Sequence, residues 1–313
     1  MRPLLSLFVA AAAAALSLTS AAAQSPAATC RSTATGVIRT HQLTSRTFGN
    51  TRTIRVLLPD DYDAPANAAR RYPVLYLVDG QNLFDACLSE VSKREWQVDE
   101  TVRRLVAERR VPAMIVVGID HAGRDRGHEF LPYRDPMGGP PPEREPAGRQ
   151  WPRFLATEVM PLVDSTYRTL RGAENTGMGG SSYGGIITLH TLTAAPGLVG
   201  YGLIESAPLW VGMGQVVRDT DPLSTFVKKV YIGTGGSEVR GHDDLARTWL
   251  QLSRRLEQNF RDAGYDSTRV RLVIDPAAQH TEDAWAARFP MALEFLFGDW
   301  HPPANSAPAP RRQ

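Results

Sequence analysis

Thr176-Gly-Met-Gly-Gly-Ser-Ser-Tyr-Gly-Gly-Ile-Ile187 is the stretch that decides the fold of this chain. Within it, residues 180–184 read G-x-S-x-G with Ser182 at the centre, a pattern typical of a sharp strand-to-helix turn that exposes a serine hydroxyl. Glycines suit such a turn because it needs unusual backbone angles and close packing of neighbouring elements. A strand-like run precedes the motif, and the apolar segment 186–192 can continue as a buried helix. Short Gly-Ser patterns also arise by chance, so Ser182 needs chemical partners elsewhere in the chain.

Apolar runs on both sides of this motif predict buried strands that alternate with helices. Residues 73–78 and 112–119 are continuous apolar, β-branched runs, which indicates strands buried on both faces of a sheet. Further strands are predicted at 199–204, 229–234 and 269–274, and helices at 96–108, 151–167, 243–263 and 281–297. Residues 37–47 and 51–58 predict two antiparallel strands at one edge. The fold class predicted is therefore α/β, with a mostly parallel central sheet, helices on both faces and an antiparallel N-terminal edge.

The two ends of the chain differ in composition from the part between them. Residues 1–23 combine a positive start, an apolar Ala-rich run and a small-residue end, the pattern of a signal peptide cleaved near Ala23. We therefore expect an exported protein, periplasmic or secreted, whose mature chain has no transmembrane span. The expected organisation is a signal peptide at 1–23, a flexible leader at 24–35, one folded domain at 36–298 and a disordered Pro/Ala-rich tail at 299–313.

Charge and cysteine content exclude some classes of protein. The formal net charge is only +2, and the basic residues are scattered among acidic ones, so we predict no nucleic-acid partner. Cys30 and Cys87 are the two cysteines. In an exported chain they are candidates for a disulfide, with two unpaired thiols as the alternative. Two cysteines without an H-E-x-x-H or C-x-x-C pattern do not make a zinc site, so we predict no metal.

A histidine near the end of the domain is the candidate base for Ser182. A serine needs a base within hydrogen-bond reach, and the base needs an acid that holds its tautomer. In hydrolases with this turn the partners follow in the order Ser, Asp or Glu, His. Of the histidines after the motif, His242 and His280 follow predicted strands. His280 comes directly after the last strand and is the candidate base; the alternative is that it only caps the following helix.

The candidate acid follows the preceding strand. Glu238 lies in a Gly-rich loop directly after residues 229–234. Asp243 and Asp244 come slightly later and serve equally well as caps of the next helix. Asp275 is nearer to His280 in sequence, but it lies at the end of a strand, where it can simply fix the turn. We take Glu238 as the acid and keep Asp243 and Asp244 as alternatives.

Two backbone N–H groups must face the negative charge that develops on the attacked carbonyl oxygen. One should belong to Tyr183, the residue after the nucleophile. The other should come from the loop after the strand at 73–78, where Asp79-Gly80-Gln81 lets the backbone approach closely. We predict the N–H of Gln81 as this second donor, with an ordinary turn as the alternative.

Five segments together resemble a known family: Tyr76-Leu-Val-Asp-Gly-Gln-Asn-Leu-Phe84, Ile115-Val-Val-Gly-Ile-Asp120, Arg126-Gly-His-Glu-Phe-Leu-Pro132, Gly179-Gly-Ser-Ser-Tyr-Gly-Gly185 and His280-Thr-Glu-Asp-Ala-Trp285. This family of the α/β-hydrolase superfamily takes in enterochelin-esterase-like proteins, esterase D, feruloyl esterases and the antigen 85 mycolyltransferases. The resemblance covers about residues 45–298 and is specific for the family but not for the substrate.

The resemblance implies an α/β-hydrolase fold without a large lid and a serine esterase mechanism that needs no cofactor. The family's serine falls on Ser182, its histidine on His280 and its oxyanion loop on Asp79-Gly80-Gln81. The antigen 85 pattern of a Gly-rich loop that ends in Glu falls on Glu238, whereas some siderophore esterases of this group work with a Ser-His dyad.

We therefore predict an exported serine esterase that forms an acyl-enzyme on a small-molecule or glycan-linked ester. One alternative is an acyltransferase of the same fold, similar to the mycolyltransferases. Another is a non-catalytic binding protein on the hydrolase scaffold, which would have lost its nucleophile or base. Several aromatic residues are candidates for lining the substrate pocket, although such residues more often pack in the core or at the surface: Trp96, Phe130, Tyr133, Trp151 and Trp210.

Overall fold

A computed structural model describes residues 30–91, 93–135, 144–220 and 227–302. Residues Ser32–Gln313 belong to one compact unit, and the fold described below lies within it. The predicted signal peptide lies outside the described residues, as do residues 24–29 of the predicted leader and residues 303–313 of the predicted tail. None of the helices in the described ranges is long and apolar enough to cross a membrane.

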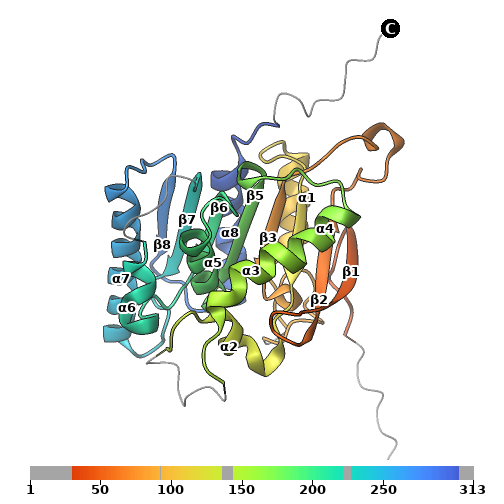
Figure 1. The fold of residues 1–313 in the computed structure, drawn as a ribbon. Helices are drawn as coiled ribbons and strands as arrows, with labels where there is room; N and C mark the ends of the chain where they lie inside the picture. The colour runs from red at the N-terminus through yellow and green to blue at the C-terminus, as the bar shows by residue number, and fades with distance from the viewer. Residues whose placement is uncertain (1–29, 92, 136–143, 221–226, 303–313) are drawn as a thin grey trace, which may run out of the picture. The chain divides into compact units, whose positions relative to one another are not determined.

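One sheet of eight strands forms the centre of the fold, with the order β1-β2-β4-β3-β5-β6-β7-β8 (Figure 1). The strands are β1 (Val37–Thr44), β2 (Thr51–Leu58), β3 (Val74–Val78), β4 (Ile115–Ile119), β5 (Thr176–Ser181), β6 (Tyr201–Glu205), β7 (Lys229–Gly235) and β8 (Val270–Asp275). β1 pairs antiparallel with β2, and β2 pairs antiparallel with β4. All pairs from β4 to β8 are parallel. The predicted mostly parallel sheet with an antiparallel N-terminal edge is confirmed.

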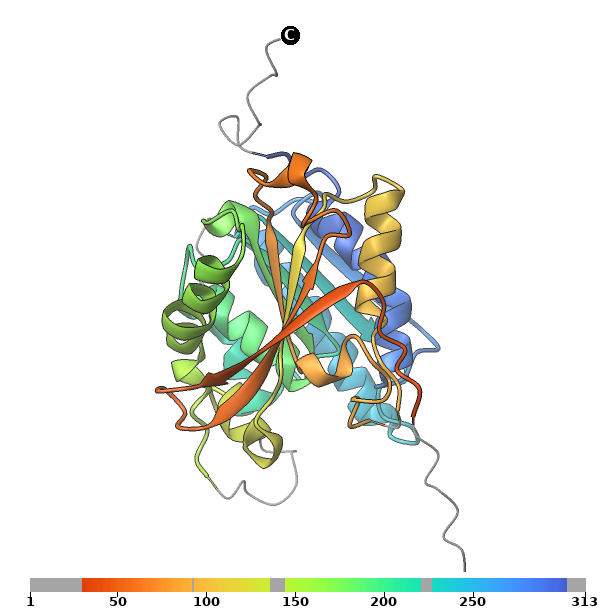
Figure 2. The same ribbon diagram turned by 90° about the vertical axis from the view of Figure 1, so that its right-hand side faces the viewer.

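Helices cover both faces of the sheet (Figure 2). They are α1 (Val98–Ala107), α2 (Arg126–Phe130), α3 (Trp151–Phe154), α4 (Met160–Thr166), α5 (Tyr183–Ala194), α6 (Val211–Arg218), α7 (Asp243–Asp262) and α8 (Glu282–Phe297). A π-helical stretch, Leu155–Val159, joins α3 to α4, so the predicted helix at 151–167 is one run in three parts. The short helices α2 and α6 were not predicted, since neither is long enough to show an apolar periodicity in sequence.

The central strands are buried on both faces because each contributes side chains to two separate cores. Val74, Tyr76 and Val78 of β3 belong to the core beneath α3, α4, α5 and α7. Leu75 and Leu77 of the same strand belong to the core beneath α1 and α8. Successive residues of a strand point to opposite faces, so a continuous apolar run is what a strand between two helical layers requires.

Candidate active site

Ser182 lies at the turn between β5 and α5, at the carboxyl edge of the parallel sheet. Its backbone has φ 56° and ψ −126°, and α5 begins at the next residue. A non-glycine residue with positive φ is strained by roughly 1–3 kcal/mol and persists only where the surroundings hold it. Here the Ser182 N–H donates to the carbonyl oxygen of Glu205 in β6 at 2.9 Å. The turn predicted from the G-x-S-x-G motif is present, with Ser182 at its tip.

His280 and Glu238 meet across two neighbouring loops at the same edge. His280 follows β8 and Glu238 follows β7, and the His280 Nδ1 lies 2.8 Å from Glu238 Oε2. The Glu238 side chain is almost fully buried, whereas the imidazole is 28% exposed. Two indole rings flank the imidazole, with centroids at 5.2 Å for Trp249 and 5.0 Å for Trp285. Since Nδ1 faces the carboxylate, Nε2 is the nitrogen left for a substrate or a serine hydroxyl.

Glu238 is held as a carboxylate acceptor. Its Oε1 accepts from the Ser206 hydroxyl and from the Gly235 N–H, both at 2.5 Å. Burial by itself raises the pKa of the Glu238 carboxyl, but the hydrogen bonds from His280, Ser206 and Gly235 outweigh it. Together they hold that pKa below its ordinary value of 4.5. The carboxyl group is therefore ionised at neutral pH, as an acid that orients a histidine must be.

Behind Glu238, a second layer of buried polar groups centres on Ser206. The Ser206 oxygen accepts from Trp285 Nε1 at 2.9 Å and from Arg288 Nη2 at 3.2 Å. Arg288 also forms a buried ion pair with Glu205, with Nη2 at 2.9 Å from Oε2. Burial raises the pKa of the Glu205 carboxyl, and Arg288 opposes that rise. The backbone carbonyl of Glu205 accepts from the Ser182 N–H. Glu205 therefore connects the turn that carries Ser182 to the polar groups around Glu238.

The other acids predicted as alternatives lie apart from His280. Asp243 and Asp244 are exposed in the first turn of α7, and Asp244 forms an ion pair with Arg247. Asp275 accepts from the Ala277 N–H at 3.1 Å, which fixes the turn after β8. Among the described residues, Glu238 is the carboxylate that hydrogen-bonds to His280.

The loop predicted to supply an oxyanion donor folds as a short helix after β3, Gly80–Asn82. Gln81 and Tyr183 both lie in the first turn of a helix, where N–H groups lack internal acceptors. Asp79 precedes the loop with φ 59° and accepts two hydrogen bonds from Arg126, at 2.7 and 2.8 Å. A Cβ on Gly80 would lie 2.6 Å from the Gly118 carbonyl carbon, so only glycine lets the loop pack this close to β4.

A pocket of about 260 Å³ opens at this edge. Ser182 and His280 both line it, together with Val78, Asp79, Asn82, Glu90, Val91, Trp96, His121, Arg126, Ser181, Glu282 and Trp285. Gln81 and Tyr183 are not among the lining residues, but the adjacent residues Asn82 and Ser182 are. No hydrogen bond joins the Ser182 hydroxyl to His280 among the described residues. Catalytic hydrogen bonds often tighten only when substrate binds.

Some of the residues that line the pocket were predicted from the sequence, and others were not. Of the five predicted aromatic residues, Trp96 lines the pocket and the others do not. Phe130 and Trp151 are fully buried in the core instead. Arg126 and Trp285 were missed as functional residues, although both lie in segments that carry the family resemblance. Ser206 left no signal, because its role depends only on where β6 ends.

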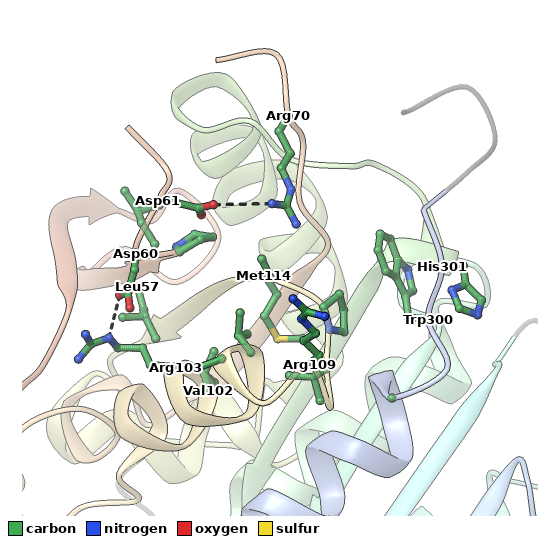
Figure 3. Close-up of a pocket in the computed structure, with 18 residues that line it drawn as sticks. Leu57, Asp60, Asp61, Arg70, Val102, Arg103, Arg109, Met114, Trp300 and His301 are labelled. Carbon is green, nitrogen blue, oxygen red and sulfur yellow. Dashed lines mark hydrogen bonds and ion pairs between the residues drawn. The ribbon is translucent and has the colours of Figure 1, made fainter. Parts of the chain in front are cut away.

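A second pocket, of about 560 Å³, lies away from these residues (Figure 3). Its walls come from the end of β2, the end of α1 and Trp300, and two ion pairs, Asp60–Arg103 and Asp61–Arg70, lie at its rim. Met114, which lines it, directly precedes β4. This pocket is therefore at the amino edge of the parallel strands, and it contains none of the candidate catalytic residues.

Cys30 and Cys87, predicted as candidates for a disulfide, are both disulfide-bonded in the structure.

Comparison with known proteins identifies the family of this chain. The family model described as "Putative esterase" matches residues 45–296. The uncharacterized protein YbbA of Bacillus subtilis is 22% identical over 264 residues, which are 82% of this chain and 96% of YbbA. A siderophore enterobactin esterase of Emericella nidulans is 27% identical over 139 residues, 44% of this chain and 46% of that protein.

The fold is also similar to that of a solved structure, an IroE-like serine hydrolase from Shewanella oneidensis. The TM-score is 0.69 at 18% identity, over 84% of this chain and 81% of that one. At this identity the likeness establishes the α/β-hydrolase fold, and the activity follows from the match to the family. The chain belongs to the family described as "Putative esterase" and is a carboxylic ester hydrolase.

Proposed function

We propose that this esterase works through a Ser182–His280–Glu238 triad and an acyl-enzyme intermediate. The observation that supports the proposal most is the 2.8 Å contact between His280 Nδ1 and Glu238 Oε2, beside a pocket that Ser182 also lines. Because Nδ1 of His280 faces the acid, Nε2 is the ring nitrogen without a proton in the neutral imidazole. The strained backbone at Ser182 presents the hydroxyl at the tip of the turn.

The reaction runs in two halves. The Ser182 oxygen bonds to the ester carbonyl carbon while its proton passes to His280 Nε2. The N–H groups of Tyr183 and Gln81 donate to the resulting oxyanion. The bond from carbon to the alcohol oxygen then breaks, and the alcohol leaves with the proton from Nε2. Water next attacks the acyl-enzyme, gives one proton to Nε2, and the Ser182 oxygen regains it as the carboxylic acid departs.

The pocket favours an ester whose acyl group is short or flat. Its volume of about 260 Å³ lies below the roughly 300–1,000 Å³ of pockets that take drug-sized ligands. Trp96 and Trp285 provide an apolar wall, and Arg126 and Glu90 provide charged groups. We propose small acyl and aryl esters as the substrate class. Structures of similar fold include siderophore hydrolases of Aspergillus nidulans and a ferulic acid esterase.

The test is hydrolysis of an ester panel by the mature protein and by Ser182→Ala. The panel holds p-nitrophenyl acetate, butyrate and decanoate, methyl ferulate, acetylated xylan and a catecholate trilactone. We expect turnover of short or aryl esters that disappears in Ser182→Ala, and labelling of Ser182 by a fluorophosphonate. Faster hydrolysis of the decanoate would contradict the substrate class. Labelling of Ser182 without hydrolysis of any ester would favour the acyltransferase alternative.

We also propose that the protein is exported. The support is the sequence of residues 1–23, whose positive start, apolar run and Ala21-Ala22-Ala23 end have the form of a cleavable signal. The full-length chain expressed in a bacterium with an outer membrane should be recovered outside the cytoplasm, with Gln24 as its first residue. Recovery of the cytoplasmic chain with its N-terminus intact would contradict this.

A further inference from the structure

Three carboxylates form a cluster at the start of α1. One oxygen from each of Glu95, Asp99 and Glu100 lies within 4.8 Å of the others. Glu95 is 6% exposed and Asp99 is fully buried, while Glu100 is half-buried. Three carboxyl groups thus meet at a place from which water is largely excluded.

No protein group compensates this charge directly. One oxygen of each carboxylate is buried without a hydrogen-bond partner: Glu95 Oε2, Asp99 Oδ1 and Glu100 Oε2. None of the ion pairs among the described residues includes any of the three. Arg103 acts on Asp99 and Glu100 at longer range, but its own ion pair is with Asp60, at 2.8 Å. A buried carboxylate without a partner is strongly unfavourable, so such oxygens need either a bound cation or a proton.

The segment before β1 holds two of the carboxylates in place through hydrogen bonds. The Thr33 hydroxyl donates to Glu95 Oε1. The Thr35 N–H and hydroxyl donate to Asp99 Oδ2, at 2.5 and 2.9 Å. These bonds use one oxygen of each carboxylate and orient the side chain. The unpartnered oxygens of Glu95 and Asp99 are therefore preorganised rather than free to turn toward solvent.

We propose that Glu95, Asp99 and Glu100 bind a hard divalent cation, with Ca²⁺ as the ion that fits. Oxygen-only ligands suit Ca²⁺, which takes them at about 2.3–2.6 Å, so two ligands on opposite sides of the ion lie about 4.6–5.2 Å apart. The three carboxylate oxygens lie no more than 4.8 Å from one another, which is within the span of the ligands of a single Ca²⁺ ion. The helix dipole favours acidic residues in the first turn of α1, but it offers no partner to these oxygens.

This site differs in kind from the zinc sites that cysteine and histidine patterns form. The cluster contains carboxylates, of which Asp99 and Glu100 follow Glu95 by four and five residues, together with threonines from a distant segment. The cation would connect residues 32–35 to the start of α1. It would also anchor the loop before α1, which supplies Glu90, Val91 and Trp96 to the Ser182 pocket.

A shared proton is the competing explanation. Burial raises the pKa of Glu100 to about 7, with Asp99 as a neighbour that also raises it. A proton between these two side chains would satisfy one oxygen of each without any metal. The two explanations differ in their dependence on Ca²⁺ and on pH, so one set of measurements separates them.

The experiment uses the full mature protein after treatment with EDTA and dialysis, at pH 7.5. Calorimetric titration with CaCl₂ should show one ion per chain, with a dissociation constant of the order of 10⁻⁴ M. The melting temperature should rise by about 5 °C in 10 mM CaCl₂. Asp99→Asn and Glu100→Gln should each abolish both effects. Asp244→Asn, at an exposed acid in the first turn of α7, is the matched control and should retain them.

Absence of saturable Ca²⁺ binding by the EDTA-treated protein would overturn the proposal. An equal melting shift in the wild type and in Glu100→Gln would also overturn it, because the ion would then act elsewhere. A Glu100→Gln protein that is more stable than the wild type at pH 7.5, with no response to Ca²⁺ in either, would establish the shared proton instead. Glu100 is half-buried and its glutamine is isosteric, so this variant remains informative if Asp99→Asn does not fold.

Discussion

Replacing Glu238 by glutamine tests the proposed acid with almost no change of shape. In the structure, Glu238 Oε1 accepts from the Gly235 N–H and the Ser206 hydroxyl, both at 2.5 Å, and Oε2 faces His280 Nδ1. A backbone N–H can only donate, so the amide oxygen of glutamine must take the Oε1 position. The amide nitrogen then faces His280 and donates to Nδ1.

This exchange reverses the tautomer of the histidine. With Nδ1 as acceptor, the proton of the neutral imidazole resides on Nε2, the nitrogen that must take the proton of Ser182. The variant also loses the charge that stabilises the imidazolium. Loss of the orienting acid in a Ser-His-acid triad lowers kcat by about 10³–10⁴-fold. That factor corresponds to roughly 4–5.5 kcal/mol of transition-state stabilisation.

The assay is hydrolysis of p-nitrophenyl butyrate at pH 7.5, with the rate of fluorophosphonate labelling as a second readout. Asp243→Asn and Asp244→Asn are matched controls, since both acids are exposed on α7, and both should keep wild-type rates. Thermal unfolding checks that Glu238→Gln folds. A kcat/KM for Glu238→Gln within tenfold of the wild type would refute the reasoning and favour a Ser-His dyad. A large loss of hydrolysis rate in either control would indicate that the acid is Asp243 or Asp244 of α7.

Three further outcomes follow from buried groups. Gly233→Ala would place a Cβ 2.1 Å from Glu205 Oε1. We therefore expect the free energy of unfolding, measured in urea, to fall by about 1–3 kcal/mol, and an unchanged value would contradict this. Glu129→Ala leaves the guanidinium of Arg52 buried without its ion pair. The free energy of unfolding should then fall by about 3–5 kcal/mol in the same assay, and a fall of less than about 1 kcal/mol would contradict this. Because folding lowers the pKa of Glu238 below 4.5, its stabilising contribution is present above pH 4.5 and is lost as the pH falls through the folded-state value. The melting temperature of the wild type should therefore drop more steeply on acidification than that of Glu238→Gln, and equal slopes would speak against the lowered pKa.

Much of the fold was predictable because its signals are local. The apolar runs at β3 and β4 and the amphipathic spacing of α7 each lie within one element, and each predicted segment agrees with the structure to within a few residues. Ser182 was predictable for the same reason, since its turn needs glycines at fixed offsets. His280 followed from its place after the last strand, because the carboxyl ends of parallel strands share one edge.

The sequence did not determine which carboxylate pairs with His280. Glu238, Asp243 and Asp244 lie within seven residues of one another, and all three follow β7. Their distance from His280 depends on the path of one loop, which packing against β8 decides. The Ser206 network and the position of Arg126 over the pocket depend in the same way on side chains from separate elements.

By itself, then, the sequence determined the α/β layering, the turn that carries Ser182 and the place of His280, because periodicity, turn chemistry and strand order are properties of contiguous residues. Only the tertiary structure decided which carboxylate faces His280, which groups surround Glu238 and how residues 32–35 meet the acidic start of α1. Those contacts join segments tens of residues apart, and their geometry arises only when the sheet and its helices pack together.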